Sequence, residues 1–104
     1  MIEYLTRENE INKVLRNQRK NKETIKILFH SPLWDDLSYN IAESAKNSDL
    51  ALSDDKIYLI DTFDMPHAYC IFKLRKTPAL VTIDDGGVGI VDYPPFIIKG
   101  LGIE

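Results

Sequence analysis

The stretch Ile25-Lys26-Ile27-Leu28-Phe29, followed directly by His30-Ser31-Pro32, decides the fold. A short, dense apolar run is typical of a strand that is buried on both faces of a sheet. Proline has no N–H group and ends regular strand pairing, so the strand should stop before Pro32. We therefore expect residues 25–29 to form a central strand of a sheet that is covered on both sides.

The segments on either side of this strand alternate between strand and helix patterns. The sequence predicts strands at residues 1–5, 25–29, 57–60, 79–83 and 88–91, and helices at residues 7–21, 37–48 and 66–74. Alternation predicts parallel strands with right-handed crossovers. Asp84-Asp85-Gly86-Gly87 predicts a hairpin that adds an antiparallel edge. The expected fold is a small three-layer α/β domain with a mixed sheet and the order β-α-β-α-β-α-β-β.

Within the predicted helices, three local features stand out. Thr6 with Asn9 gives only part of a capping-box pattern before the first helix, because Glu or Gln is expected three residues after the cap. Apolar spacing gives that helix a buried stripe at Ile11, Val14, Leu15 and Gln18, and gives the second helix a stripe at Leu37, Ile41 and Ala45. The basic cluster Arg16, Arg19, Lys20 and Lys22 ends the first helix, where cations complement the helix dipole; we favour a solvated face over a phosphate-binding patch.

The composition excludes several classes of protein. The 104 residues form one expected domain, residues 1–104, with 13 basic and 16 acidic side chains and a net charge of −3. No apolar run approaches the roughly 20 residues of a membrane span. A mildly acidic chain argues against nucleic acid as a partner. The single cysteine excludes an internal disulfide, and no signal peptide opens the chain, so we expect a cytoplasmic protein.

Three stretches together resemble the thioredoxin family. Residues 2–6, followed by a helix, resemble the family's opening strand and first helix, and the central strand leading to Trp34 resembles the approach to its active site. Phe72-Lys73-Leu74-Arg75-Lys76-Thr77-Pro78 resembles the stretch that leads to the family's cis-proline, and Asp85-Gly86 fits the turn before the last strand. The resemblance runs in order from residue 2 to about residue 93 and implies a thioredoxin-like fold with a cis Thr77–Pro78 bond; a trans proline at the start of a strand is the alternative.

Two departures from the family decide the functional interpretation. The family's Trp-Cys-x-x-Cys motif matches Trp34-Asp35-Asp36-Leu37-Ser38, so neither cysteine position holds a thiol. Thiol–disulfide exchange needs a thiolate that attacks sulfur. The family's buried acidic residue matches Phe29, which removes a proton-transfer partner. Disulfide oxidoreductase activity is therefore not expected.

The residues at the matching positions still suit binding. Asp35 and Asp36 are interpreted as caps of the second helix rather than as a catalytic pair, since no base or metal group accompanies them. Trp34 is either a core aromatic or an exposed anchor for a polypeptide. The resemblance implies that the backbone before Pro78 pairs with a bound extended segment. Pro94 stands where relatives usually have glycine beside the same groove, which alters that rim.

No residue pattern predicts a metal or a cofactor. His30 and His67 lack ligand spacing, and His30 with Asp35 or Asp36 makes too few ligands. Cys70 is interpreted as a small buried residue, with a reactive thiol as the alternative. Gly86-Gly87 precedes a strand rather than a helix, so it is not a phosphate loop.

The C-terminal tail, residues 94–104, is apolar but too rich in proline and glycine for a full closing helix. We expect this final helix to be missing or truncated. The tail then either packs irregularly on its own sheet or completes the fold against another molecule, for example in a homodimer.

These features predict a redox-inactive, thioredoxin-like module that binds a protein or an extended polypeptide segment, with no cofactor, no metal and no membrane contact. The expected binding residues are Trp34, Asp35, Asp36, Thr77, Pro78, Tyr93 and Pro94. The alternatives are a single-thiol redox protein that uses Cys70 and a structural subunit of a larger assembly.

Overall fold

The structure, a computed structural model, describes residues 2–31, 36–47, 56–64, 72–84, 89–94 and 96–101. Its elements are β1 (Ile2–Leu5), α1 (Glu8–Asn21), β2 (Ile25–His30), α2 (Asp36–Lys46), β3 (Lys56–Asp61), β4 (Ala79–Ile83), β5 (Gly89–Asp92) and α4 (Ile97–Leu101). All five strands match their predicted positions to within one residue at each end. Within the described ranges, no helix is long and apolar enough to cross a membrane.

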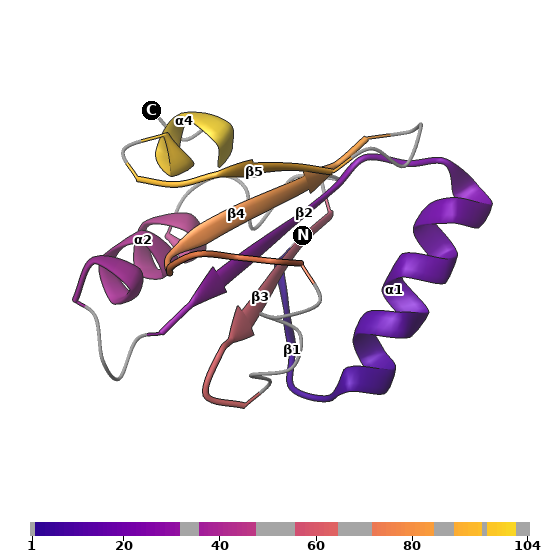
Figure 1. The fold of residues 1–104 in the computed structure, drawn as a ribbon, viewed down its shortest axis with the longest axis horizontal. Helices are drawn as coiled ribbons and strands as arrows, with labels where there is room; N and C mark the ends of the chain where they lie inside the picture. The colour runs from indigo at the N-terminus through magenta and orange to yellow at the C-terminus, as the bar shows by residue number, and fades with distance from the viewer. Residues whose placement is uncertain are drawn as a thin grey trace.

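The strands form one mixed sheet in the order β1-β3-β2-β4-β5 (Figure 1). β1 and β2 run parallel to β3, whereas β5 runs antiparallel to β4. β4 also runs antiparallel to β2, with Ala79 opposite Phe29 and Ile83 opposite Ile25. The predicted mixed sheet is thus confirmed. The prediction of parallel strands from the alternation of strands and helices is wrong for β4.

The register explains the direction of β4. Asp61, at the end of β3, lies opposite His30, and Ala79, at the start of β4, lies opposite Phe29. The chain therefore leaves β3 and enters β4 at the same end of the sheet, where β2 also ends. A parallel strand would require the chain to cross back to the opposite end of the sheet before the strand begins. Because the chain starts β4 at the end where β2 and β3 stop, β4 runs antiparallel to β2.

The predicted helix at residues 66–74 lies mostly outside the described residues, and its described end is not helical. Phe72 and Lys73 form a turn, and Leu74 has no regular structure. Lys73 has a φ of 54°, in the left-handed region. A residue in this conformation ends a right-handed helix, so the predicted helix is wrong at this end.

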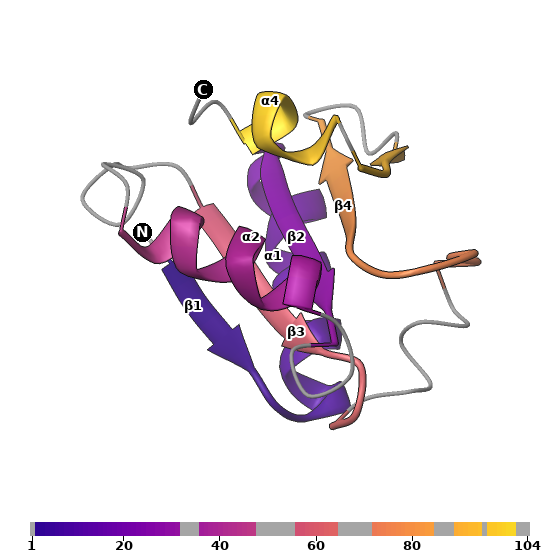
Figure 2. The same ribbon diagram turned by 90° about the vertical axis from the view of Figure 1, so that its left-hand side faces the viewer.

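The sheet separates two apolar clusters and makes the fold three-layered. In Figure 1, α1 lies on one side of the strands and α2 and α4 lie on the other, and Figure 2 shows α2 and α4 in front of the sheet. Ile25, Ile27 and Phe29 of β2 belong to the cluster beneath α1, whereas Leu28 belongs to the cluster beneath α2 and α4. Successive side chains of a strand point to opposite faces, which is why one apolar run supplies both clusters.

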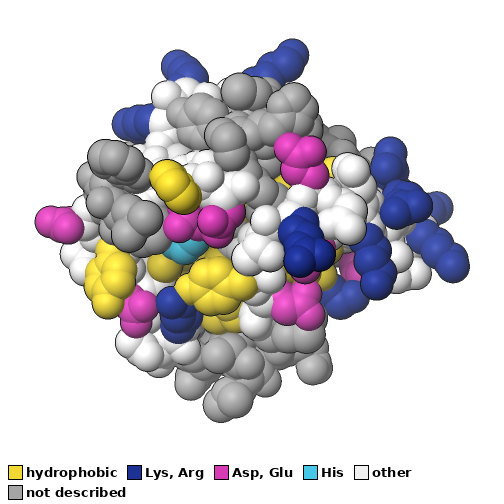
Figure 3. Space-filling model, turned by 90° about the horizontal axis from the view of Figure 1, so that it is seen from below, with side chains coloured by type: hydrophobic (Ala, Val, Ile, Leu, Met, Phe, Trp, Pro, Cys, Tyr) yellow, Lys and Arg dark blue, Asp and Glu magenta, His cyan; other side chains and the backbone are white. Residues whose placement is uncertain are grey.

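The predicted helix stripes are mostly confirmed. In α1, Ile11 and Gln18 are buried and Val14 and Leu15 are half-buried. The four residues of the basic cluster are all exposed, and Lys and Arg side chains gather at the edge of the molecule where α1 lies (Figure 3). In α2, Ile41 and Ala45 are buried, but Leu37 is 48% exposed because it lies in the first turn, before the helix reaches the core.

The truncated final helix is confirmed as the five residues of α4. Ile97 and Leu101 are buried against the sheet of their own chain. A Cβ atom at Gly100 would lie only 2.9 Å from Cδ2 of Leu80 and 3.0 Å from Oδ2 of Asp92. The glycine that weakens the helix is therefore also what allows α4 to approach β4, and Lys26 Nζ donates a 2.6 Å hydrogen bond to the Gly100 carbonyl.

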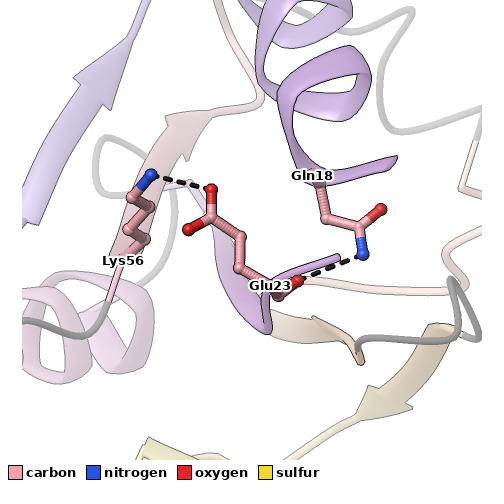
Figure 4. Close-up of polar contacts among 3 residues, drawn as sticks. All are labelled: Gln18, Glu23 and Lys56. Carbon is pink, nitrogen blue, oxygen red and sulfur yellow. Dashed lines mark hydrogen bonds and ion pairs between the residues drawn. The ribbon is translucent and has the colours of Figure 1, made fainter. Parts of the chain in front are cut away.

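A group of polar side chains lies at the end of the sheet where β2 and β3 begin (Figure 4). The buried Gln18 side chain donates from Nε2 to the carbonyl oxygens of Glu23, at 3.1 Å, and Asp84, at 2.7 Å. Glu23 also forms a 2.7 Å ion pair with Lys56. The end of α1 is thereby joined to the starts of β2 and β3, since these residues flank those elements.

The N-terminus of α1 lies one residue later than the Thr6–Asn9 pattern suggests. Arg7 is the cap residue and Glu10 occupies the third helical position. Oε1 of Glu10 accepts hydrogen bonds from the main-chain N–H groups of Thr6 and Arg7 and from the Thr6 hydroxyl, at 3.1 to 3.2 Å. Arg7 has no side-chain acceptor, so only the Glu10 half of a capping box forms.

We expect Glu10 to make the stability of the protein depend on pH. The Thr6 N–H bond is the main cause that lowers the pKa of Glu10. A carboxylate with a lowered folded-state pKa stabilises the protein fully above its unfolded pKa of about 4.3, and this contribution is lost as the pH falls through the folded value. Glu10→Gln should therefore lower the urea midpoint at about pH 7 and leave it nearly unchanged at about pH 3.

Glu8→Gln is the matched control, since Glu8 lies in the same first turn but makes none of the three Glu10 bonds. Equal losses in the two variants at neutral pH would mean that general helix-dipole electrostatics, not these bonds, produce the effect.

Candidate functional site

Three hydroxyl groups meet where the parallel strands end. Ser31 follows β2, Thr62 follows β3 and Thr77 lies two residues before β4. The Ser31 Oγ atom lies 2.5 Å from Oγ1 of Thr62 and 2.9 Å from Oγ1 of Thr77. A hydroxyl group donates once and accepts from other groups, so Ser31 can bridge both threonines. We call Ser31, Thr62 and Thr77 the hydroxyl cluster.

Two hydrogen bonds next to the hydroxyl cluster join the ends of β2 and β3. The Thr62 N–H group donates to the His30 carbonyl at 3.0 Å. The His30 side chain is 2% exposed, and its Nδ1 lies 2.7 Å from the Ile60 carbonyl oxygen. A carbonyl only accepts, so Nδ1 carries the proton. These bonds fix the ends of β2 and β3 relative to each other.

The segment before β4 carries Thr77 and Pro78. The Thr77–Pro78 peptide bond is cis, the geometry that the resemblance implies. Pro78 is buried and Thr77 is half-buried. The main-chain N–H of Thr77 makes no hydrogen bond with another residue in the described part of the chain. A donor of this kind, beside a fixed side chain, can pair with an extended polypeptide.

The structure brings together some of the predicted binding residues. The Tyr93 hydroxyl accepts a 3.0 Å bond from the Arg75 N–H, which places Tyr93 beside the segment that leads to Thr77. Pro94 follows Tyr93 and is half-buried, and Asp36 is exposed at the start of α2. Trp34 and Asp35 lie outside the described residues, as do Cys70 and His67.

Several residues at this edge were not predicted. Ser31 and Thr62 are polar residues that directly follow buried apolar runs, and this placement is the signal that could have identified them. Phe63 is 64% exposed, and its N–H donates to Oδ1 of Asp61 at 2.9 Å. An aspartate that binds the backbone two residues on forms a turn, which here presents Phe63 to solvent. Arg75 and Lys76 lie over the Tyr93 ring.

Within the described ranges, no group of three His, Cys, Asp or Glu side chains is placed to hold a metal ion. The observed groups at this edge are hydroxyls, main-chain amides, aromatic rings, the cations of Arg75 and Lys76, and the carboxylates of Asp36 and Asp61.

Comparison with solved structures identifies the architecture. A thioredoxin of Fasciola hepatica is 14% identical, with a TM-score of 0.73 over 96% of both chains. Thioredoxin O2 of Arabidopsis thaliana is 19% identical, with a TM-score of 0.68 over 96% of this chain and 90% of that one. A chloroplastic thioredoxin z is 15% identical, with a TM-score of 0.72 over 97% and 91%.

The chain has a thioredoxin-like fold. No protein-family model and no curated protein matches the sequence. The one cysteine of the chain, Cys70, leaves a thioredoxin-like fold without a Cys-x-x-Cys motif. At the position that the resemblance assigns to a buried acid, Phe29 is fully buried, with its ring centroid 5.3 Å from that of Phe72.

We expect Ser31→Ala to destabilise the protein, because it removes the bridge between Thr62 and Thr77. A hydrogen bond contributes about 0.5–1.5 kcal/mol net, so the loss of both Ser31 bonds should lower the free energy of unfolding by about 1–3 kcal/mol. Urea denaturation measures the loss, and amide chemical shifts should change at Thr62 and Thr77. Ser44→Ala, on the exposed face of α2, is the control and should cost little. Equal stability of the two variants would contradict the bridging role.

Proposed function

We propose that this chain is a non-catalytic, thioredoxin-like module that binds an extended segment of another protein at the edge carrying Thr77 and Pro78. The observation that carries the proposal is the placement of Thr77, whose side chain is held by Ser31 while its N–H meets no described acceptor. Peptides add to a protein by pairing with such main-chain groups, and this contact needs no cysteine.

The absence of catalysis is proposed from the sequence. A single cysteine gives no resolving partner within the chain, and thiol–disulfide exchange normally proceeds through a second thiol. Several structural neighbours are redox proteins, so the proposal separates the fold from the chemistry that thioredoxins perform. Trp34, Asp35 and Asp36 complete the proposed surface on the α2 side, and Tyr93 and Pro94 form its rim. We expect the protein to act in the cytoplasm.

A peptide library tests the binding site. Peptides selected from a random library against the whole chain should shift the amide signals of Ser31, Thr62 and Thr77. Trp34→Ala and Thr77→Val should weaken their binding about tenfold or more, because aromatic side chains dominate many interfaces and Thr77→Val removes the hydroxyl bond that holds the pairing main chain in place. Tyr39→Ala, an exposed aromatic on α2, and Thr82→Val, on β4, are matched controls that should bind normally. Normal binding by both site variants would reject the site.

Two activity measurements address the alternative of a single-thiol redox protein. The chain should not accelerate insulin reduction, and Cys70 should react with a disulfide reagent no faster than an ordinary exposed thiol at neutral pH. Rapid reaction of Cys70 would favour the single-thiol protein over the binding module.

A further inference from the structure

Two cations lie beside Thr77 on a common aromatic support. The guanidinium carbon of Arg75 lies 5.9 Å from the centroid of the Tyr93 ring, and Nζ of Lys76 lies 5.8 Å from it. Both side chains are exposed. Cations at this distance are attracted to the electron-rich face of an aromatic ring. We call Arg75 and Lys76 the cationic rim.

Tyr93 is a fixed support rather than a mobile side chain. Its ring is partly buried and packs against the apolar cluster beneath α1. Its hydroxyl is bound by the Arg75 N–H group at 3.0 Å. Since both ends of the side chain are held, the cationic rim keeps its place relative to the main chain that continues into Thr77.

The cationic rim is not neutralised by any carboxylate that the structure describes. The two ion pairs in the described ranges join Lys46 to Glu43 and Lys56 to Glu23, on α2 and at the start of β3. The chain as a whole carries three more acidic than basic side chains. Two adjacent cations without an acidic partner, in an acidic protein, complement an anionic ligand.

We propose that the segment bound at Thr77 is an acidic extended peptide whose carboxylates pair with Arg75 and Lys76. This inference rests on the proposed function and names the chemistry of the partner. Lys76 immediately precedes Thr77, and an extended peptide advances about 3.3 Å per residue, so a carboxylate one or two residues from the paired backbone reaches the cationic rim. The planar guanidinium of Arg75 accommodates a carboxylate through two parallel hydrogen bonds.

The test compares two labelled peptides of about ten residues, one alternating threonine with glutamate and one alternating threonine with glutamine, patterns that favour an extended chain. Fluorescence anisotropy should show at least about fivefold tighter binding of the acidic peptide at low salt, and this preference should largely disappear at about 0.3 M salt. Arg75→Gln and Lys76→Gln should each weaken acidic-peptide binding about two- to fivefold, without affecting the glutamine peptide.

The control is the double variant Arg16→Gln with Lys20→Gln, which removes two positive charges, one more than either rim variant, from the exposed face of α1. It should bind the acidic peptide as the unmodified protein does. Equal losses in the α1 and rim variants would overturn the inference, because general attraction would then explain the binding. Equal binding of both peptides, with amide shifts at Thr77, would overturn the acidic preference while leaving the proposed function intact. No binding of either peptide would also overturn this inference, and the library experiment would decide the function separately.

Discussion

The structure depends on the burial of β2 between two layers. Its neighbours β3 and β4 take up its main-chain hydrogen bonds, and its side chains fill both apolar clusters. A buried main-chain group without a partner is costly, so a strand that is covered on both faces needs a neighbour at each edge. β2 ends at His30, two residues before Pro32 in the sequence, and Ser31 follows at that end. The buried strand thereby brings Ser31 to the end of β3, where Thr62 completes the contact.

The same packing places an apolar side chain where the resemblance leads us to expect an acidic one. Phe29 joins the apolar cluster at the position that the resemblance assigns to an acid, and its ring packs against Phe72. A buried carboxyl group can exchange a proton, whereas a phenyl ring contributes only apolar packing. The described polar groups at this edge are hydroxyls, amides, cations and the carboxylates of Asp36 and Asp61, all of which can form hydrogen bonds with a peptide.

Much of the fold could be predicted because it follows from local patterns. The apolar runs at residues 57–60 and 79–83 identify strands, since few other structures bury so many consecutive apolar side chains. The direction of β4 could not be predicted in this way, because it depends on the end of the sheet at which the chain starts β4 after it leaves β3 at Asp61. The cap of α1 was misplaced by one residue because Glu10, rather than a side chain at residue 6, satisfies the free N–H groups.

The site was less predictable than the fold. Thr77 and Tyr93 were expected at the binding surface through the resemblance, but the bond that joins Tyr93 to Arg75 spans 18 residues. No local pattern reports a contact of that kind. The Ser31–Thr62 bond likewise spans 31 residues and exists only because β2 and β3 end side by side.

The order of the strands also bears on how the chain acquires its shape during synthesis. In the described sheet β1 pairs only with β3, so during synthesis β1 has no partner strand until residues 56–61 have followed it. α1 forms from contacts within a short segment and can assemble early, whereas closing the loop between β1 and β3 costs chain entropy. The most N-terminal strand of the described sheet therefore gains its partner only after α1, β2 and α2 have been made.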